Sequence, residues 1–342
     1  MKIAVVLFNL GGPDSLQAVE PFLRNLFSDP AILSVPGLVR GPLGRVIARR
    51  RAPVAREIYG KIGGRSPIVE ETRAQAEALD KVLAERGVQA KSFIAMRYWH
   101  PFSAETVDAV KVWNPDHVVL LPLYPQFSTT TTGSSFLEWD RAAKDAGLVV
   151  PTTRVCCYPD APGFVEAAVA LIRHALESRR RDLQYRLLLS AHGLPKRTIA
   201  KGDPYQWQVE RSAKAIVDAL GISDLDWQVC YQSRVGPLEW IGPSTDAEIE
   251  RAGKEGKGVV VAPIAFVSEH SETLVELDIE YAHLAERVGV PHYLRVPTVS
   301  AQPLFIDALA DLVMRAKGAT GTVNLRTVRI CPADCKGCVC KR

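Results

Sequence analysis

The stretch RLLLSAHGLP, residues 186–195, joins an apolar run of strand length to a histidine, followed by a glycine and a proline that turn the chain. An apolar run without polar alternation is typical of a strand covered by helices on both faces of a parallel sheet. Ligands of open α/β sheets bind beyond the carboxyl ends of the strands. His192 is therefore a candidate to face a ligand, as a general base or as a ligand of a transition metal. The alternative is a histidine that is hydrogen-bonded within its loop.

Similar runs alternate with helix-period segments along the whole chain. We predict strands at 2–9, 90–96, 117–121, 153–157, 186–190, 228–231, 258–264 and 293–296. We predict helices at 15–27, 67–86, 104–113, 134–146, 162–179, 204–220, 246–255, 270–288 and 303–317. The pairs Ser66-Pro67 and Asp203-Pro204 are typical helix starts. The alternation predicts an α/β fold of doubly wound parallel sheets, in two similar halves that break near residue 150.

Composition excludes several classes of protein. Apolar residues make up 47% of the 342 residues, and the net charge of +4 is too small to indicate nucleic acid. No run of about 18 apolar residues is present, so we expect no membrane-spanning helix. The opening MKIAVVLFNL lacks a small-residue cleavage site and is expected to be a buried strand, so we expect a cytoplasmic protein.

The segment 31–56, AILSVPGLVRGPLGRVIARRRAPVAR, interrupts the alternation and is rich in arginine. One interpretation is a surface excursion with one basic helix. The other is a lip that touches a membrane surface or an apolar ligand. The residues alone favour neither.

A second strand end, at 263–274, carries two carboxylates and a histidine within four residues, and the helix behind it adds more acid. Glu272, Glu276 and Glu280 are spaced i, i+4 and i+8, which forms one acidic stripe. The residues opposite are Leu274, Leu277, Tyr281 and Leu284, so α-helical periodicity alone favours a solvated face. The functional alternative is a carboxylate path for a divalent cation and protons.

A third strand end is followed by the hydroxyl-bearing residues 128–132, which precede a predicted helix. The simpler interpretation is that these hydroxyls cap the helix, and the alternative is that they bind an anion at its N-terminus. Gly11-Gly12-Pro13 after the first strand does not form a GxGxxG motif, which disfavours a nucleotide enzyme.

Four of the seven cysteines lie within CPADCKGCVC, at 331, 335, 338 and 340. In a reducing compartment such a set indicates zinc or an iron–sulfur cluster more than disulfides. Cys156 and Cys157 close the predicted strand 153–157 and could supply an internal ligand. Neighbouring strand residues point to opposite faces, so only one of these two is expected to reach a given site.

Three long motifs resemble the ferrochelatase family: LLLSAHGLPKRTI around His192, CYQSRVGPLEWIGPSTD at 230–246 and FVSEHSETLVELDIEY at 266–281. FNLGGPDS, KIGGRSPI, RYWHPF and LPLYPQFSTTTTGSS occur with them in the family's order, over nearly the whole chain. The resemblance implies two Rossmann-like domains of the chelatase type with a porphyrin cleft between them. On this basis we expect domains at 1–148 (with the lip at 31–56) and 149–300, then a C-terminal helix and cysteine segment at 301–342.

The resemblance also implies roles for individual residues. His192 is expected to be the catalytic base or metal ligand, with Glu272 facing it across the macrocycle. Glu276 and Glu280 would continue a metal and proton path on an unusually wound helix, which would answer the objection that the stripe faces solvent. The residues expected to line the porphyrin site are Asn9, Leu10, Ser66, Arg97, Tyr98, Tyr124 and Trp240.

Some ferrochelatases bind a [2Fe–2S] cluster through one internal cysteine and three in a C-terminal extension, and the chain is similar to these. The animal pattern places the internal cysteine where this chain has threonines, so the resemblance favours the later bacterial position. We expect Cys157, Cys331, Cys338 and Cys340 as ligands, with Cys156 and Cys335 as alternates.

The resulting hypothesis is an enzyme, a lyase that inserts Fe²⁺ into protoporphyrin IX and releases two protons to form protohaem. The alternatives are a coproporphyrin ferrochelatase, a cobalt chelatase of a related tetrapyrrole, and a non-catalytic haem or iron–sulfur sensor. Its partners are then porphyrin and ferrous iron, with no nucleic acid. We also expect residues 31–56 to make peripheral contact with the inner membrane, and the protein to be a monomer or a homodimer.

Overall fold

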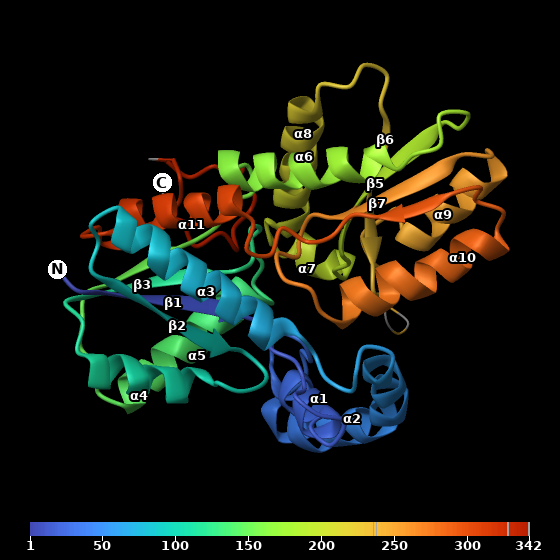
Figure 1. Cartoon of the computed structure of the whole chain (residues 1–342). Coiled ribbons are helices and arrows are strands. Elements are labelled where there is room, and N and C mark those ends of the chain that lie inside the picture. The colour runs from blue at the N-terminus through green and yellow to red at the C-terminus, as the bar shows by residue number, and fades with distance from the viewer. Residues whose placement is uncertain (235, 237, 327, 341–342) are drawn as a thin grey trace. The chain divides into compact units, whose positions relative to one another are not determined.

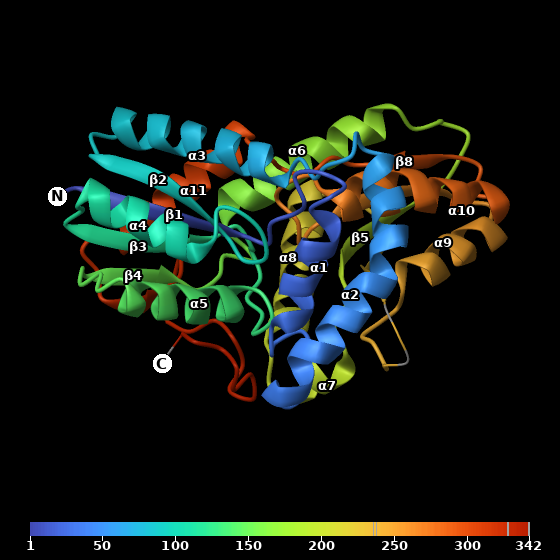
Figure 2. The same ribbon diagram turned by 90° about the horizontal axis from the view of Figure 1, so that it is seen from below.

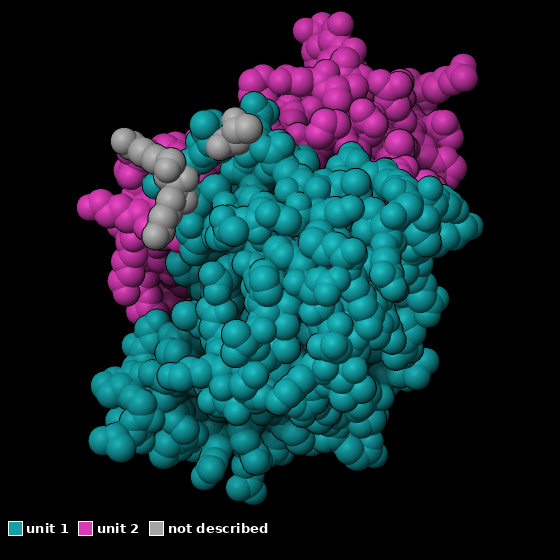
Figure 3. Space-filling model, turned by 90° about the vertical axis from the view of Figure 1, so that its left-hand side faces the viewer, with its two compact units in different colours: residues 1–157, 309–329, 339–342 teal, residues 158–308, 330–338 magenta. Residues whose placement is uncertain are grey.

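The structure is a computed structural model that describes residues 1–234, 236, 238–326 and 328–340. The chain divides into two compact units, coloured separately in Figure 3. Unit 1 comprises residues 1–157, 309–329 and 339–342, and unit 2 comprises residues 158–308 and 330–338. The predicted division of the chain into domains at residues 148 and 300 stays a prediction.

Unit 1 is built on a five-stranded parallel sheet in the order β2-β1-β3-β4-β9. Its strands are β1 (Ile3–Asn9), β2 (Ala90–Met96), β3 (His117–Pro122), β4 (Thr152–Val155) and β9 (Gly321–Val323). The strand β1 is buried along its whole length, as its unbroken apolar run predicts. Strand β9 was not predicted, because its three residues GTV are too short to carry a pattern; pairing with β4 defines it.

The helices of unit 1 are α1 (Val19–Ser28), α2 (Gly37–Gly60), α3 (Ile68–Glu85), α4 (Ser103–Trp113) and α5 (Thr132–Asp145). Helix α11 (Pro303–Ala316) begins in unit 2 and ends in unit 1. Helices α4 and α5 pack their apolar sides on one face of the sheet, while α3 lies on the other face (Figure 2). The doubly wound arrangement of this unit is therefore confirmed.

Unit 2 contains a four-stranded parallel sheet in the order β6-β5-β7-β8. Its strands are β5 (Tyr185–His192), β6 (Asp226–Gln232), β7 (Gly258–Pro263) and β8 (Tyr293–Arg295). Its helices are α6 (Pro162–Glu177), α7 (Lys196–Ala200), α8 (Tyr205–Leu220), α9 (Thr245–Lys254), the π-helix η1 (Glu272–Glu280) and α10 (Tyr281–Arg287). Figure 1 shows α6 and α8 on one side of this sheet and α9 and α10 on the other.

The segment 31–56 contains more regular structure than its composition indicates. Helix α2 is 24 residues long and includes Pro42 and Pro53. Its buried residues are Gly44, Ala48, Ala52 and Tyr59, of which the first three are small. A β-carbon on Gly44 would come within 2.9 Å of the Phe27 carbonyl oxygen of α1. Packing against α1 therefore stabilises a helix that propensity disfavours.

No helix in the described part of the chain is long and apolar enough to cross a membrane.

Candidate functional site

Three strand ends of unit 2 bring polar side chains together, as the carboxyl edge of a parallel sheet predicts. His192 is the last residue of β5, Gln232 is the last residue of β6, and Glu272 begins η1 after β7. The Nδ1 atom of His192 lies 2.9 Å from Oε2 of Glu272. The imidazole therefore has a carboxylate partner and is not simply hydrogen-bonded to its own loop.

The two groups shift each other's proton affinity. Burial lowers the pKa of His192, but the charge and hydrogen bond of Glu272 outweigh it and leave that pKa above its ordinary value. Burial raises the pKa of Glu272, but His192 and then His270 outweigh it and leave that pKa well below the usual range. The pair is therefore a charged carboxylate beside a histidine that holds a proton readily.

Glu276, one turn further along η1, is held by four donors. It accepts from the Ser233 backbone N–H (2.8 Å), the Ser233 hydroxyl, Gln232 Nε2 (3.1 Å) and the Tyr281 hydroxyl (3.2 Å). Burial, and after it the charge of Glu272, raises the pKa of Glu276. Two neighbouring carboxylates thus have pKa values pushed in opposite directions, which is the arrangement by which enzymes assign acid and base roles.

The π-helical winding of η1 overturns the solvated-face interpretation of the acidic stripe. Residues 272–280 form i→i+5 turns, so α-helical periodicity does not apply to them. Leu277 and Tyr281 of the predicted apolar face are buried, but Thr273 and Val275 are buried as well, whereas Leu274 is only partly buried. Glu272 and Glu276 are partly buried and only Glu280 is exposed. The winding implied by the family resemblance is therefore present.

Aromatic residues surround the histidine. Phe266 stacks edge-on to the His192 ring, with centroids 6.5 Å apart, and lies 4.6 Å from the His270 ring. Trp240 packs over Gly193, since a β-carbon there would lie 3.2 Å from the indole. An apolar wall beside an ionisable pair suits a flat aromatic ligand.

In unit 1, the residues predicted to line the site follow the carboxyl ends of β1, β2 and β3. Arg97 Nη2 donates to Asp29 Oδ2 (2.7 Å), and Arg97 Nε donates to the Ser134 hydroxyl (2.7 Å). The Tyr98 and Ser134 hydroxyls donate to the same Asp29 oxygen, the former at 2.8 Å. Asp29 is buried, so this network fixes the arginine and the lip segment that follows Asp29.

The remaining predicted wall residues are also close to strand ends. Asn9 is buried, donates to the Thr72 hydroxyl (3.1 Å) and accepts from the Leu10 N–H (2.9 Å). Ser66 lies so close to Gly12 that a β-carbon there would be 2.5 Å from it. Tyr124 packs on the sheet core, and burial raises the pKa of its hydroxyl.

The cysteines are mostly buried, but the described residues contain no group of three His, Cys, Asp or Glu side chains arranged to hold a metal ion. Strand β4 ends at Val155, so the prediction that Cys156 and Cys157 point to opposite faces is wrong; their sulfurs lie 3.1 Å apart. A side-chain amide donates to each of two further sulfurs: Gln208 Nε2 to Cys331 (3.1 Å) and Asn324 Nδ2 to Cys340 (3.4 Å).

Sequence reasoning missed the residues that orient the predicted ones. The spacing of residues in the sequence does not indicate a role for Asp29 in unit 1 or for Gln232 and Ser233 in unit 2. Their positions directly after α1 and at the end of β6 were the available clue, since polar residues at strand and helix ends gather at one edge of a parallel sheet.

A family profile described as Ferrochelatase matches residues 2–317. Curated relatives named ferrochelatase include one from Caulobacter vibrioides, 54% identical over 99% of this chain and 98% of its own. Another, from Phenylobacterium zucineum, is 52% identical over 100% of this chain and 98% of its own. That of Pelagibacter ubique is 48% identical over 99% of both chains.

Solved structures give the fold. The SirB protein of Bacillus subtilis with Fe³⁺ has a TM-score of 0.54 at 13% identity, covering 93% of this chain and 96% of its own. The sirohydrochlorin chelatase SirB of Bacillus subtilis subspecies spizizenii with cobalt has a TM-score of 0.51 at 12% identity, with coverage of 93% and 94%. The expected chelatase-type fold of two parallel-sheet units is confirmed.

Proposed function

Because the chain belongs to the ferrochelatase family, we propose that it is a lyase that inserts Fe²⁺ into protoporphyrin IX, with release of two protons, as the last step of haem biosynthesis. The observation that carries the proposal is the His192–Glu272 pair at the end of β5, with Glu276 hydrogen-bonded one turn away.

The chemistry follows from the charges of these groups. Insertion exchanges two pyrrole N–H protons for a divalent cation, so the site must accept protons and tolerate the metal. His192 accepts a proton from the macrocycle, and the carboxylate of Glu272 stabilises the resulting imidazolium. Glu276, whose pKa is raised, takes the proton onward along η1. Imidazole and carboxylate are also ligands that bind ferrous iron and can release it.

The porphyrin itself is bound by aromatic and apolar surfaces together with fixed cations. We propose Asn9, Leu10, Arg97, Tyr98 and Trp240 as contacts, with Ser66 and Tyr124 serving the propionates. Arg97 is already held by Asp29, so its position costs little on binding. Apolar residues on α2 favour protoporphyrin over the more carboxylated coproporphyrin.

Anaerobic turnover with ferrous iron, offered protoporphyrin and coproporphyrin separately, tests the reaction and the substrate. We expect the haem spectrum with protoporphyrin. His192→Ala should lower insertion by 10² or more while porphyrin binding, read by fluorescence quenching, persists. Near-normal turnover of this variant would remove His192 from the mechanism. No insertion by the unaltered protein would favour a haem carrier or sensor.

We also propose a [2Fe–2S] cluster bound by Cys157, Cys331, Cys338 and Cys340, with Cys156 and Cys335 as alternates. Thiolates accept hydrogen bonds better than thiols, so the amide donors on Cys331 and Cys340 favour the charged form that a cluster needs. Such a cluster supplies one-electron redox chemistry when bound. We assign it a structural or sensing role, outside the insertion step.

We further propose that the lip, residues 31–56, attaches the protein peripherally to the inner membrane from the cytoplasmic side. Helix α2 exposes Leu38, 94% accessible, and Val39, Leu43, Val46 and Val54 beside the six arginines of the segment 37–56, which are also exposed or partly exposed. Exposed apolar side chains flanked by cations suit an anionic lipid surface.

A further inference from the structure

The carbonyl group of His192 is held from a part of unit 2 that the insertion chemistry does not use. Tyr205, the first residue of α8, is buried, and its hydroxyl donates to the His192 carbonyl oxygen (3.1 Å). On the other side, the Gly193 N–H donates to the Gln232 carbonyl (2.9 Å). The peptide group that joins His192 to Gly193 is therefore held at both its carbonyl and its N–H.

Helix α8 is fixed at its start by the cysteine segment, residues 331–338, which also belongs to unit 2. The Gly337 N–H donates to the Gly202 carbonyl (2.9 Å), just before the helix. Gly202 has φ +91°, and a β-carbon there would lie 2.7 Å from the Lys336 nitrogen. The two backbones are thus in a contact that only glycine permits.

A second contact lies one helical turn further. Gln208 is fully buried, and its Nε2 donates to the Cys331 sulfur (3.1 Å). Tyr205 and Gln208 are three residues apart, so they lie on the same face of α8. The Asp203 carboxylate caps this turn by accepting from the Tyr205 N–H (3.0 Å).

We propose that Tyr205 is a positioning residue for His192 and that residues 331–338 are a clamp that holds Tyr205 in place. The clamp acts through Gly202 and Gln208 at the start of α8, and the Tyr205 hydroxyl transmits it to the His192 carbonyl. Loosening it lowers the rate of the chemical step while porphyrin affinity is kept. This inference rests on the proposed insertion activity, but its contacts join protein atoms of unit 2 directly.

A double-mutant cycle in the full chain tests the coupling. Tyr205→Phe removes the hydroxyl, and Gln208→Leu removes the amide that reaches Cys331. Because small displacements of a catalytic group cost up to about 10²-fold, we expect kcat to fall roughly tenfold and severalfold respectively, with unchanged KM for porphyrin. The double variant should match Tyr205→Phe alone. The matched control is Gln206→Leu, whose amide reaches only the exposed Glu210; it should leave kcat unchanged.

A second pair of variants tests the clamp independently, in case the buried substitution Gln208→Leu causes misfolding. Gly337→Pro removes the N–H that reaches Gly202, whereas Gly337→Ala keeps it. We expect lowered kcat from the proline variant and recovery with alanine. Iron and acid-labile sulfide are assayed in every variant, so an effect through a cluster is recognised separately.

Amide hydrogen exchange of residues 193–204 gives a readout that needs no turnover. Exchange should quicken in Tyr205→Phe, Gln208→Leu and Gly337→Pro and stay unchanged in Gln206→Leu. Losses of kcat that multiply in the double variant, or unchanged exchange in Gln208→Leu and Gly337→Pro, would overturn the clamp. Absence of insertion in the unaltered protein would overturn the proposed function instead, and the exchange result would still decide the clamp.

Discussion

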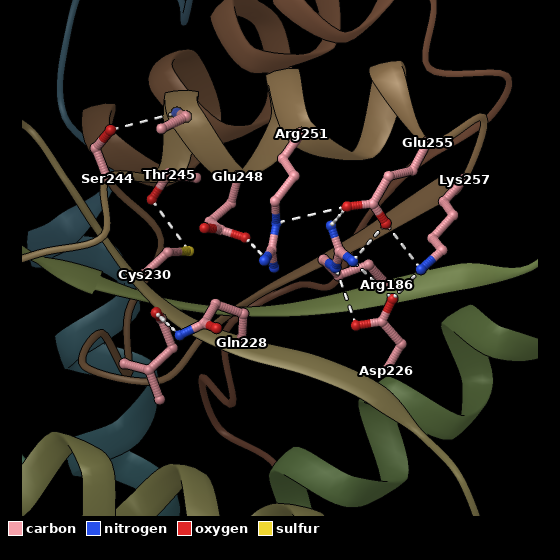
Figure 4. A network of polar contacts seen from close by, with 12 residues as sticks. Arg186, Asp226, Gln228, Cys230, Ser244, Thr245, Glu248, Arg251, Glu255 and Lys257 are labelled. Carbon is pink, nitrogen blue, oxygen red and sulfur yellow. Dashed lines mark hydrogen bonds and ion pairs between the residues drawn. The ribbon is translucent and has the colours of Figure 1, made fainter.

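Arg186, at the start of β5, is the centre of an ion network that should hold the amino-terminal edge of the unit 2 sheet together (Figure 4). Its side chain is 5% exposed. It donates to both oxygens of Asp226 (3.0 and 2.9 Å) and to Glu255 Oε2 (2.8 Å). Lys257 Nζ reaches the same two carboxylates at 2.8 and 2.9 Å.

Replacing Arg186 by Met keeps an unbranched apolar stem and removes the guanidinium with its charge. Loss of one partner of a fully buried ion pair costs about 3–5 kcal/mol, and loss of an exposed one about 0–1 kcal/mol. Here the carboxylates of Asp226 and Glu255 are 31% and 37% exposed and retain Lys257, so we expect about 2 kcal/mol. With a urea m-value of about 2 kcal/mol/M, the unfolding midpoint should fall by about 1 M.

The effect should depend on pH. Burial raises the pKa of Asp226, but Arg186 and Lys257 outweigh it and leave that pKa below its usual value. Lys257, and next to it Arg186, lower the pKa of Glu255 to about 2. A depressed carboxyl pKa contributes stability that is complete above the unfolded pKa of about 4 and is lost as the pH falls through the folded value. The difference between unaltered protein and Arg186→Met should therefore shrink from pH 5 towards pH 2.

Urea unfolding followed by circular dichroism measures both effects. Arg180→Met is the matched control, because its pair with Asp182 is exposed on both sides, and its midpoint should not move. Equal midpoints for Arg186→Met and Arg180→Met, or a difference that grows at low pH, would refute the reasoning.

Three further outcomes are expected. Glu272→Gln removes the charge that raises the pKa of His192, so the acidic limb of the kcat/KM profile should move to lower pH; an unmoved limb would dissociate the two groups. Cys338→Ser should bleach the visible absorbance of the proposed cluster, and retained bands with full iron content would show that Cys338 is not a ligand. Leu38→Glu should weaken binding to anionic lipid vesicles severalfold without changing turnover of detergent-solubilised porphyrin, and unaltered vesicle binding would exclude α2 as the contact.

Local sequence patterns were sufficient to predict a segment's structure where its surroundings are uniform. The continuous apolar runs of β1 and β7 are buried strands of parallel sheets, and each was predicted within a residue of its observed bounds. Parallel strands carry helices on both faces, so every position of such a strand has the same apolar requirement, and sequence alone records it. The place of His192 at a carboxyl end followed from the same rule.

Patterns failed where packing overrides propensity. The sequence left open whether 31–56 is a surface excursion with one basic helix or a lip. Helix α2 contains two prolines and several glycines, which lower its helix propensity, yet close contact with α1 makes it one helix of 24 residues. The winding of η1 likewise has no signature in the residues taken alone, because α-helical spacing places its carboxylates on the solvated side.

By itself, then, the sequence determined the two α/β halves, the strand ends and the residue types that gather at them. The tertiary structure decided which of those side chains meet: Glu272 with His192, Glu276 with Ser233, and Tyr205 with the His192 carbonyl. The physical reason is that these contacts join residues 13 to 80 positions apart. Their distances depend on strand register, on a π-helical turn and on the docking of the cysteine segment, none of which local spacing encodes.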